Sequence, residues 1–163
     1  MSIAIATGLR LRPERADDAA FAGALYREER WPEFALLAWP EAATDAFLDS
    51  QFALQQAHAA RAHPAADRWI VERHRKPIGR LYVDRSTPCW RLIEIGLLAR
   101  EQGRGRGTLV LRWLMREASA AGAAVDLHVR HENRRAAALY RRLGFVDAES
   151  SVGSHARLRW DAS

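Results

Sequence analysis

Apolar residues recur along the chain with two different spacings. Alternation with polar residues, or a short apolar run between turn residues, predicts strands at residues 9–12, 69–71, 78–83, 91–98, 125–129, 145–146 and 156–160. A spacing of three to four predicts helices at residues 17–26, 42–60, 109–118 and 134–143. This order of elements indicates a mixed, layered fold of the α/β or α+β class.

Turn-forming residues separate these elements. The basic segment 74–77 predicts a hairpin, and the segment 31–40, with two Trp-Pro dipeptides, predicts a loop between the first two helices. The strand at 91–98 is apolar on nearly every position, which favours a central place in the sheet. Residues 1–8 have no basic start and only a very short apolar patch, which predicts a flexible lead-in rather than a secretory signal. One domain is therefore expected over residues 9–163.

The composition narrows the class of protein. The chain has 163 residues, of which 48% are hydrophobic and 28% charged, a balance typical of one globular domain and unlike a disordered segment or a disulfide scaffold. No stretch approaches 18 apolar residues, so no transmembrane helix is expected. Cys89 is the only cysteine, which excludes an intrachain disulfide and fits the cytoplasm as the expected location.

The chain is basic, with a net charge of +5 and a pI of about 10.3, and Lys76 is its only lysine. Such a charge is typical of proteins that bind nucleic acid, anionic membranes or phosphorylated ligands. It also arises from an arginine-rich composition without functional meaning. Guanidinium groups suit phosphate in particular, because their planar fork forms paired hydrogen bonds.

A glycine-rich turn joins the strand at 91–98 to the next helix. Its residues are Gln102, Gly103, Arg104, Gly105, Arg106, Gly107 and Thr108. Glycines permit a tight turn and a close approach of a ligand to the backbone. The first amides of a helix have no intrahelical acceptor, and the helix dipole adds positive potential. Together with two arginines, this turn predicts a phosphate-binding site.

Other chemistry is not supported by recognisable motifs. No lysine follows the glycines as a P-loop requires, and the third glycine comes one residue too early for the dinucleotide-binding pattern. His128, His131 and Glu132 have no further ligand at a recognised spacing, so no metal site is expected. No G-x-S-x-G motif is present, which argues against a serine hydrolase.

The turn does match the pattern Gln/Arg-x-x-Gly-x-Gly, through Gln102, Gly105 and Gly107. A second motif lies downstream, at Asn133, Ala136, Leu139, Tyr140, Gly144 and Phe145. In both motifs, and in their order and separation, the sequence resembles the GCN5-related N-acetyltransferase (GNAT) superfamily over residues 9–160.

The resemblance implies a fold and a cosubstrate. The fold would be a mixed, mostly antiparallel sheet with helices on both faces and one parallel pair, strands 91–98 and 125–129, that splays apart. Acetyl-CoA would enter this gap, with its pantetheine amides paired to backbone near Leu97 and Leu98 and its pyrophosphate on residues 102–108. Asn133 and Ala136 would lie beside the pantetheine arm.

The resemblance also implies an activity, the direct transfer of an acetyl group to a primary amine without an acyl-enzyme. Tyr140 matches the tyrosine that protonates the leaving thiolate, and a reference pKa of about 10 keeps it protonated at neutral pH. A packed helix tyrosine is the alternative interpretation. A backbone amide near Leu97 would stabilise the tetrahedral intermediate.

Glu94 is the candidate general base, because it lies in the middle of an otherwise apolar strand. Burial raises the pKa of a carboxyl group toward the range that suits a base. A glutamate on a polar edge, or one paired with arginine, is an equally good interpretation.

The acceptor amine is left open. By family position its site would involve Glu28, Glu29, Trp31, Phe34, Trp39 and Ser150–His155. The two glutamates would attract an amine, or they are solvated while the tryptophans belong to the core. A homodimer is also compatible with the family, whereas a membrane partner is not expected.

Two other functions remain as alternatives. The first is a basic module that binds RNA or DNA through Arg134, Arg135, Arg141 and Arg142, although no stacking aromatics are interleaved with them. The second is a toxin-like acetyltransferase that acts on charged tRNA. Binding to nucleic acid would weaken steeply with salt.

Overall fold

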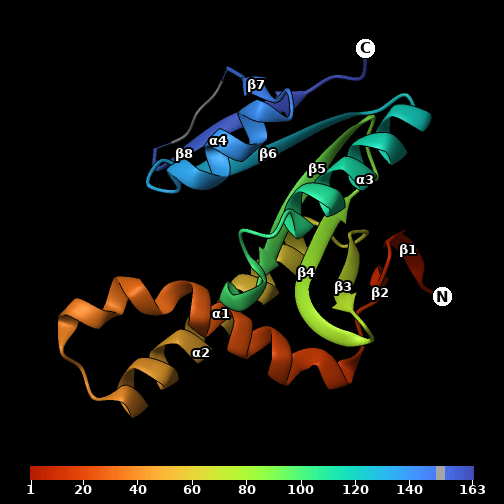
Figure 1. Cartoon of the computed structure of the whole chain (residues 1–163). Helices are drawn as coiled ribbons and strands as arrows, with labels where there is room; N and C mark the ends of the chain where they lie inside the picture. Colours follow the sequence, from red (N-terminus) through yellow and green to blue (C-terminus); the bar gives the residue numbers. More distant parts are fainter. Residues whose placement is uncertain (150–152) are drawn as a thin grey trace.

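The structure is a computed structural model that describes residues 1–149 and 153–163. Within these residues eight strands form one sheet in the order β1-β2-β3-β4-β5-β6-β8-β7, and β5 and β6 are its parallel neighbours (Figure 1). The strands are β1 (Ile3–Ala6), β2 (Leu9–Pro13), β3 (Asp67–Arg73), β4 (Lys76–Asp84), β5 (Cys89–Leu97), β6 (Ala124–Arg130), β7 (Val146–Asp147) and β8 (His155–Trp160). The α-helices are α1 (Ala19–Phe34), α2 (Glu41–Ala62), α3 (Arg106–Ala120) and α4 (Arg134–Arg142). The predicted mixed fold, the order of elements and the central place of the strand at 91–98 are confirmed.

The N-terminal residues belong to the sheet. The prediction of a flexible lead-in over residues 1–8 is wrong for Ile3–Ala6, which pairs antiparallel with β2 as an edge strand. Ile3 and Ile5 pack against the main core, and Gly8 turns the chain back with a φ of 72°. Four residues are too few for their alternation to be recognised, and pairing with β2 fixes their conformation.

The first helix is longer than the sequence predicts. Trp31 and Pro32 lie inside α1 rather than in a loop. Proline removes one backbone donor, but the amide of Ala35 still donates to the carbonyl of Trp31, so the helix continues past it. The chain reverses only at Ala38, which has a left-handed φ of 52°. This extension carries α1 to the N-terminal half of α2, where Phe34 packs against Phe47.

Helices cover both faces of the sheet. Neighbouring residues of β5 separate the two sides: a side chain at Gly96 would collide with Glu29 of α1, whereas Leu97 lies against the Gly107 position of α3. The side under α3 and α4 carries the apolar core. Its buried members include Leu11, Val71, Leu81, Leu97, Val110, Leu111, Leu114, Leu127, Tyr140 and Phe145.

The side under α1 and α2 buries charged groups. Arg80 of β4 is 1% exposed. Arg12 of β2 is also buried, with its Nε 2.5 Å from Glu72 and its Nη1 2.8 Å from Asp18, just before α1. Such pairs lose hydration on burial, and their hydrogen bonds offset that cost. Charge therefore lies between these two helices and the sheet, where an apolar layer is the usual filling.

Candidate active site

The two parallel strands part halfway along their length. The register of β5 with β6 runs from Cys89 opposite Ala124 to Leu92 opposite Leu127, and it ends there. Beyond that point β5 stays paired with β4 as far as Leu97, and β6 stays paired with β8 as far as Arg130. Each strand is therefore held by its outer neighbour, while their facing edges diverge. The splayed pair that the family resemblance implies is confirmed.

The unpaired half of β5 presents backbone groups to this gap. The amide of Leu98 donates to the carbonyl of Ile78 at 2.8 Å, on the β4 side. Because successive backbone groups of a strand point to opposite edges, Leu97 directs its amide and carbonyl toward β6. Its carbonyl accepts from the side chain of Gln102 at 2.9 Å. The amide of Leu97 thus faces the gap, as expected, while Leu98 is paired within the sheet.

A bulge marks the start of this unpaired half. Tyr82 of β4 lies opposite Glu94, but the next residue, Val83, lies opposite Leu92, so Ile93 is extra. An extra residue bends a strand and disrupts the ladder locally. The bulge lies one residue after the last β5–β6 pair, which accounts for the point at which the strands separate.

The glycine-rich turn forms the end of the gap beside Leu97. Gly103 and Gly105 have φ values of 71° and 76°, a conformation that strains other residues. Gly105 is the N-terminal cap of α3, and no side-chain capping hydrogen bond is formed there among the described residues. The first intrahelical bond runs from Leu109 to the carbonyl of Gly105, so the amides of residues 106–108 lack an intrahelical acceptor. The predicted anion-binding geometry is present in the backbone.

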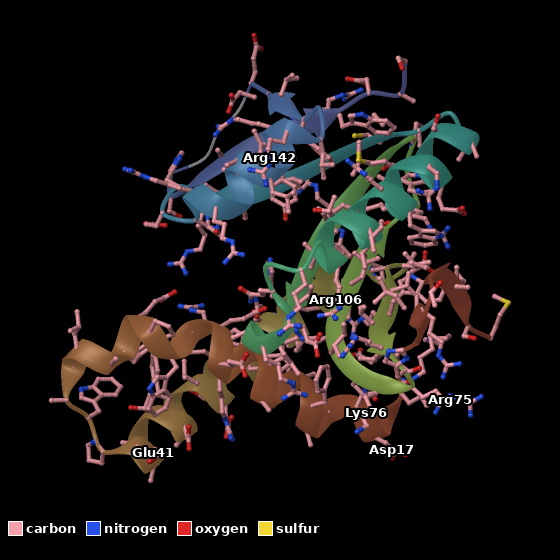
Figure 2. All side chains as sticks on the ribbon, in the orientation of Figure 1. Asp17, Glu41, Arg75, Lys76, Arg106 and Arg142 are labelled. Atoms are coloured by element: carbon pink, nitrogen blue, oxygen red, sulfur yellow. The ribbon has the colours of Figure 1, made fainter. Side chains whose placement is uncertain are left out.

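The arginines of this turn differ from the prediction. Arg106, at the start of α3 (Figure 2), is paired with the buried carboxylate of Glu101 at 2.5 Å, so its charge is compensated. Arg104 is exposed. An unpredicted residue, Arg135 of α4, approaches instead: a Cβ at Gly103 would lie 3.3 Å from its Nη2. Only the fold brings this second helix to the turn.

The downstream motif positions α4. Asn133 caps the helix, with its side-chain oxygen accepting from the amide of Ala136 at 3.2 Å, and its NH₂ group makes no hydrogen bond within the described residues. Tyr140 is buried, and its ring packs 5.7 Å from that of Phe145. Burial raises the pKa of Tyr140 to about 12. Its hydroxyl makes no hydrogen bond within the described residues, and it remains protonated at neutral pH.

A cluster of carboxylates surrounds Arg80 on the opposite side of the sheet. Glu94 of β5 lies 3.4 Å from Arg80 Nη1, and Glu14 lies 3.3 Å from its Nε. Glu94 combines features of both interpretations made from the sequence. Its side chain is mostly buried, at 19% exposed, and it is also paired with an arginine. Burial raises the pKa of both carboxyl groups, and Arg80 opposes the rise.

Glu28 and Glu29 have different environments. Glu28 accepts a hydrogen bond from the amide of Ala99 and thereby ties α1 to the end of β5. Glu29 lies over Gly96, where an added Cβ would collide with its Oε1. Glu29 is exposed to solvent, yet desolvation by the protein atoms near its carboxylate and the charge of Glu94 raise the pKa of Glu29 to about 7. A carboxylate with a pKa close to neutrality therefore lies beside the unpaired half of β5.

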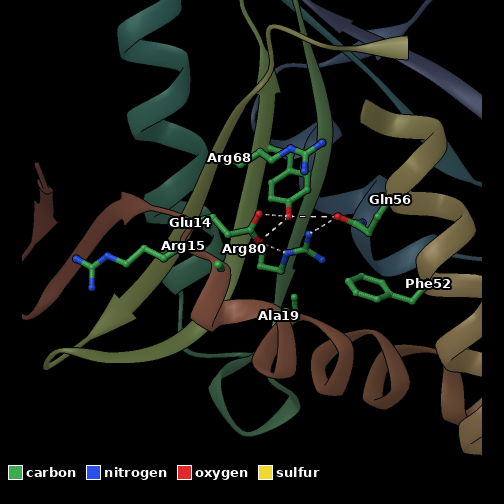
Figure 3. A pocket seen from close by; sticks show the side chains of 10 residues that line it. Glu14, Arg15, Ala19, Phe52, Gln56, Arg68 and Arg80 are labelled. Atoms are coloured by element: carbon green, nitrogen blue, oxygen red, sulfur yellow. Dashed lines mark hydrogen bonds and ion pairs between the residues drawn. The ribbon is translucent and has the colours of Figure 1, made fainter. Parts of the chain in front are cut away.

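A cavity of about 440 Å³ lies between α1, α2 and the sheet (Figure 3). Arg80 and Tyr82 form its floor, and the Tyr82 hydroxyl donates to Glu14 at 2.6 Å. Gln56 of α2 accepts from Arg80 Nη2 at 3.0 Å. No sequence motif predicts these residues, since one arginine inside a strand pattern has no motif around it.

The remaining predicted acceptor residues lie elsewhere. Phe34 and Trp39 pack with Phe47 at the far end of the α1–α2 pair, with ring centroids 5.4–6.1 Å apart, and Trp39 is 44% exposed. The exposure of Trp39 does not fit the core interpretation, and an acceptor role for this cluster stays a prediction. Of the predicted segment 150–155, residues 150–152 lie outside the described residues.

Neither a cluster of metal ligands nor a membrane-spanning helix is found in the part of the chain that the structure describes. Among residues 1–149 and 153–163, no group of three or more His, Cys, Asp and Glu side chains comes together as metal ligands would. No described helix combines the length and the apolar character needed to cross a membrane.

Comparison with known proteins places this geometry in context. The sequence model of the acetyltransferase (GNAT) family matches residues 24–145. Similar solved structures include the PaiA N-acetyltransferase of Thermoplasma acidophilum in complex with coenzyme A, at 14% identity and a TM-score of 0.70, covering 94% of this chain and 98% of that one.

Two further structures have known acceptors in their names. One is RimL, a ribosomal L7/L12 α-N-protein acetyltransferase in complex with coenzyme A, at 17% identity and a TM-score of 0.68, covering 99% of this chain and 98% of that one. The other is a chimera of the spermidine N-acetyltransferase SpeG from Vibrio cholerae with hSSAT, at 23% identity and a TM-score of 0.64, covering 94% and 95%. No curated protein sequence matches the chain.

Proposed function

Because the chain belongs to the GNAT acetyltransferase family, we propose that the gap between β5 and β6 binds acetyl-CoA and that the site transfers its acetyl group to a primary amine. The proposal rests on one observation: two features of the gap lie side by side. The unpaired edge of β5 ends at Leu97, and the uncapped N-terminus of α3 begins directly beside it. Acetyl-CoA needs both features, because its thioester arm would pair with the strand edge and its diphosphate with the amides of the helix.

The donor would be held mostly by backbone. The amide of Leu97 faces the gap and is available to an amide or thioester carbonyl, and the amides of residues 106–108 are available to the diphosphate. Arg135 would add a charge beside Gly103. Acetyl-CoA supplies the activated acetyl group and departs as the thiol. These residues would hold and orient it, and the transfer would be direct, without an acyl-enzyme.

Proton transfer would involve one group on each side of the sheet. An ammonium has no lone pair, so the acceptor must lose a proton before or during attack. Glu29, with its pKa raised to about 7, is the first candidate to take it, directly or through water, and Glu94 is the second. Tyr140, whose pKa lies at about 12, would give its proton to the leaving sulfur and recover one from solvent.

The first experiment measures donor binding by thermal unfolding with acetyl-CoA and with CoA. At a ligand concentration of 100 Kd, binding adds about 2.7 kcal/mol to the stability of the folded state. A colorimetric assay of thiol release with a panel of amines then tests transfer. Failure of acetyl-CoA to raise the Tm would overturn the proposal.

The two ends of α3 provide a matched pair of variants. Gly105 and Gly122 both have left-handed φ values, 76° and 67°, and a Cβ at either position would meet nothing within 4 Å. Replacement of either by alanine should therefore cost about 1–2 kcal/mol of stability. Gly105→Ala should in addition weaken acetyl-CoA binding by about tenfold, because it disturbs the helix N-terminus. Equal acetyl-CoA affinity in the two variants would contradict the assigned diphosphate site.

We also propose the cytoplasm as the place of action, which the single thiol of Cys89 supports. Dimerisation, and transfer to tRNA, stay predictions.

A further inference from the structure

The acceptor side of the site has two ends of opposite charge. The cavity end is lined by three arginines, Arg15, Arg68 and Arg80, and by one glutamate, Glu14, so its charged lining is net positive (Figure 3). The end nearer the gap carries Glu94 and, over Gly96, Glu29. In the sheet register Arg80 lies opposite Gly96, and its Nη1 is 3.4 Å from Glu94, so the two ends adjoin each other.

The guanidinium of Arg80 is incompletely paired. The side chain is 1% exposed, and its Nε makes no hydrogen bond within the described residues, although Glu14 Oε1 lies 3.3 Å away. Its contact with Glu94 is long, at 3.4 Å. The rings of Tyr82 and Phe52 flank it, with its central carbon 4.2 Å and 5.4 Å from their centroids. A buried donor without an acceptor is unfavourable, and a carboxylate in the cavity would remove that deficit.

Arg68 supports the same conclusion from the next strand. Its guanidinium stacks on the Tyr82 ring at 5.2 Å and forms no ion pair with any carboxylate that the structure describes. It is half-buried and lines the same cavity. Stacking leaves the edge of a guanidinium free for paired hydrogen bonds, so Arg68 has its donors available to an anion.

On this basis we propose that the acceptor is a small amine that also carries a carboxylate, as an amino acid does. Its carboxylate binds at Arg68 and Arg80, and its amino group lies at Glu29 and Glu94, next to the unpaired edge of β5. A cavity of about 440 Å³ is within the range of small-molecule sites. A polyamine would place a second ammonium group against two guanidinium groups, which is unfavourable. The inference rests on the proposed acetyl transfer.

The test compares each common amino acid with its own α-amide in the thiol-release assay. The amide retains the amine but lacks the carboxylate, and its lower amine pKa favours reaction, so any bias acts against the proposal. At least one amino acid should exceed its amide in kcat/KM by about tenfold or more, the effect expected for a charged hydrogen-bonded contact.

Two variants assign that preference to the cavity. Arg68→Gln is used instead of a substitution at Arg80, whose loss would strand buried carboxylates and endanger folding. It should lower the acid-to-amide ratio toward one and leave the KM for acetyl-CoA unchanged. Arg61→Gln, an exposed position on the last turn of α2, removes the same charge and should leave the ratio intact.

The inference is overturned if no amino acid exceeds its amide, including the case in which neither reacts, if polyamines are the preferred acceptors, or if the preference survives in Arg68→Gln. The thermal-unfolding measurement separates this from failure of the proposed function. Where acetyl-CoA raises the Tm, only the acceptor class is wrong; where it does not, the transfer itself is wrong.

Discussion

The two faces of the sheet bury different chemistry. Under α3 and α4 the buried side chains are mostly apolar, and Leu81, Val110 and Leu114 are at most 1% exposed. Under α1 and α2 the largest fully buried side chain is Arg80, with carboxylates on either side. A close-packed apolar layer gains stability with every buried methylene, whereas a buried charge gains little net stability and depends on its partners. The first face therefore holds the fold together and carries the proposed acid, Tyr140, and the second carries the carboxylates proposed as bases.

The strand β5 lies between these two regions. Leu97 points to the apolar side and Gly96 to the charged side, where Glu29 fills the space that a side chain would occupy. The glycine-rich turn at residues 102–108 leads into α3 on the apolar side. The carboxylates of Glu29 and Glu94 lie on the charged side. Changes on the α3–α4 side should thus affect stability and the donor, and changes on the α1–α2 side should affect the acceptor.

The largest expected effect on activity is at Tyr140. Tyr140→Phe removes only the hydroxyl and keeps the ring packed against Phe145, so stability and acetyl-CoA affinity should stay near those of the wild type. Loss of a general acid should lower kcat by about 10²–10⁴-fold. Steady-state kinetics measure this. The control is Tyr26→Phe, at a buried tyrosine of α1 whose hydroxyl accepts from Arg30, and this variant should keep its kcat. An unchanged kcat in Tyr140→Phe would leave Tyr140 as a packing residue.

The next effect concerns stability and separates the faces. Leu81 is 0% exposed in the apolar layer, so Leu81→Ala should lower the free energy of unfolding by about 2–5 kcal/mol. Arg68→Gln, on the other face, removes a stacked but unpaired charge and should cost about 1 kcal/mol or less. Urea denaturation followed by circular dichroism gives both values. Equal losses would show that the charged face also carries the stability of the fold.

A smaller effect is expected in the pH dependence at Glu29. The pKa of this group is raised in the folded protein to about 7, so its base form is lost as the pH falls through 7. For the wild type, kcat/KM should therefore rise with pH across that value. Glu29→Gln should remove that step and lower the activity at pH 8 by about 10–100-fold.

Glu28→Gln is the control for this change, because the neighbouring side chain bonds the amide of Ala99 and an amide oxygen can still accept that bond. Its pH profile should resemble that of the wild type. Glu94→Gln identifies the second candidate: if the step near pH 7 survives in Glu29→Gln and disappears in Glu94→Gln, Glu94 is the base.

The smallest effect is expected for Arg135 on the donor side. Arg135→Gln removes an exposed charge beside Gly103 and should weaken acetyl-CoA binding by about 3–5-fold at low salt, with less difference as salt screens the charge. Isothermal titration calorimetry at two salt concentrations measures it. Arg142→Gln, two turns further along α4 and about 10 Å away, removes the same charge and should have no such effect. The same loss in both variants would point to a general electrostatic effect.

The sequence predicted what local spacing determines. The helix and strand order, the central strand and the glycine turn all follow from periodicity and backbone chemistry, and the two motifs identified the family. The prediction was incomplete where distant segments meet. Ile3–Ala6 becomes a strand only by pairing with β2, and Arg135 of α4 reaches the turn at Gly103 only through the fold. The cluster around Arg80 joins residues that lie in or next to four different elements, and no pattern within any one of these elements predicts it.

The most direct test of the account is amide hydrogen exchange with and without acetyl-CoA. Bound donor should slow exchange in two segments, the unpaired half of β5 at Ile95–Leu97 and the turn and first helical residues at 103–108, and should leave the paired half at Cys89–Leu92 unchanged. Protection confined to other segments, or no protection at a concentration that raises the Tm, would contradict binding of the donor between the two diverging strands.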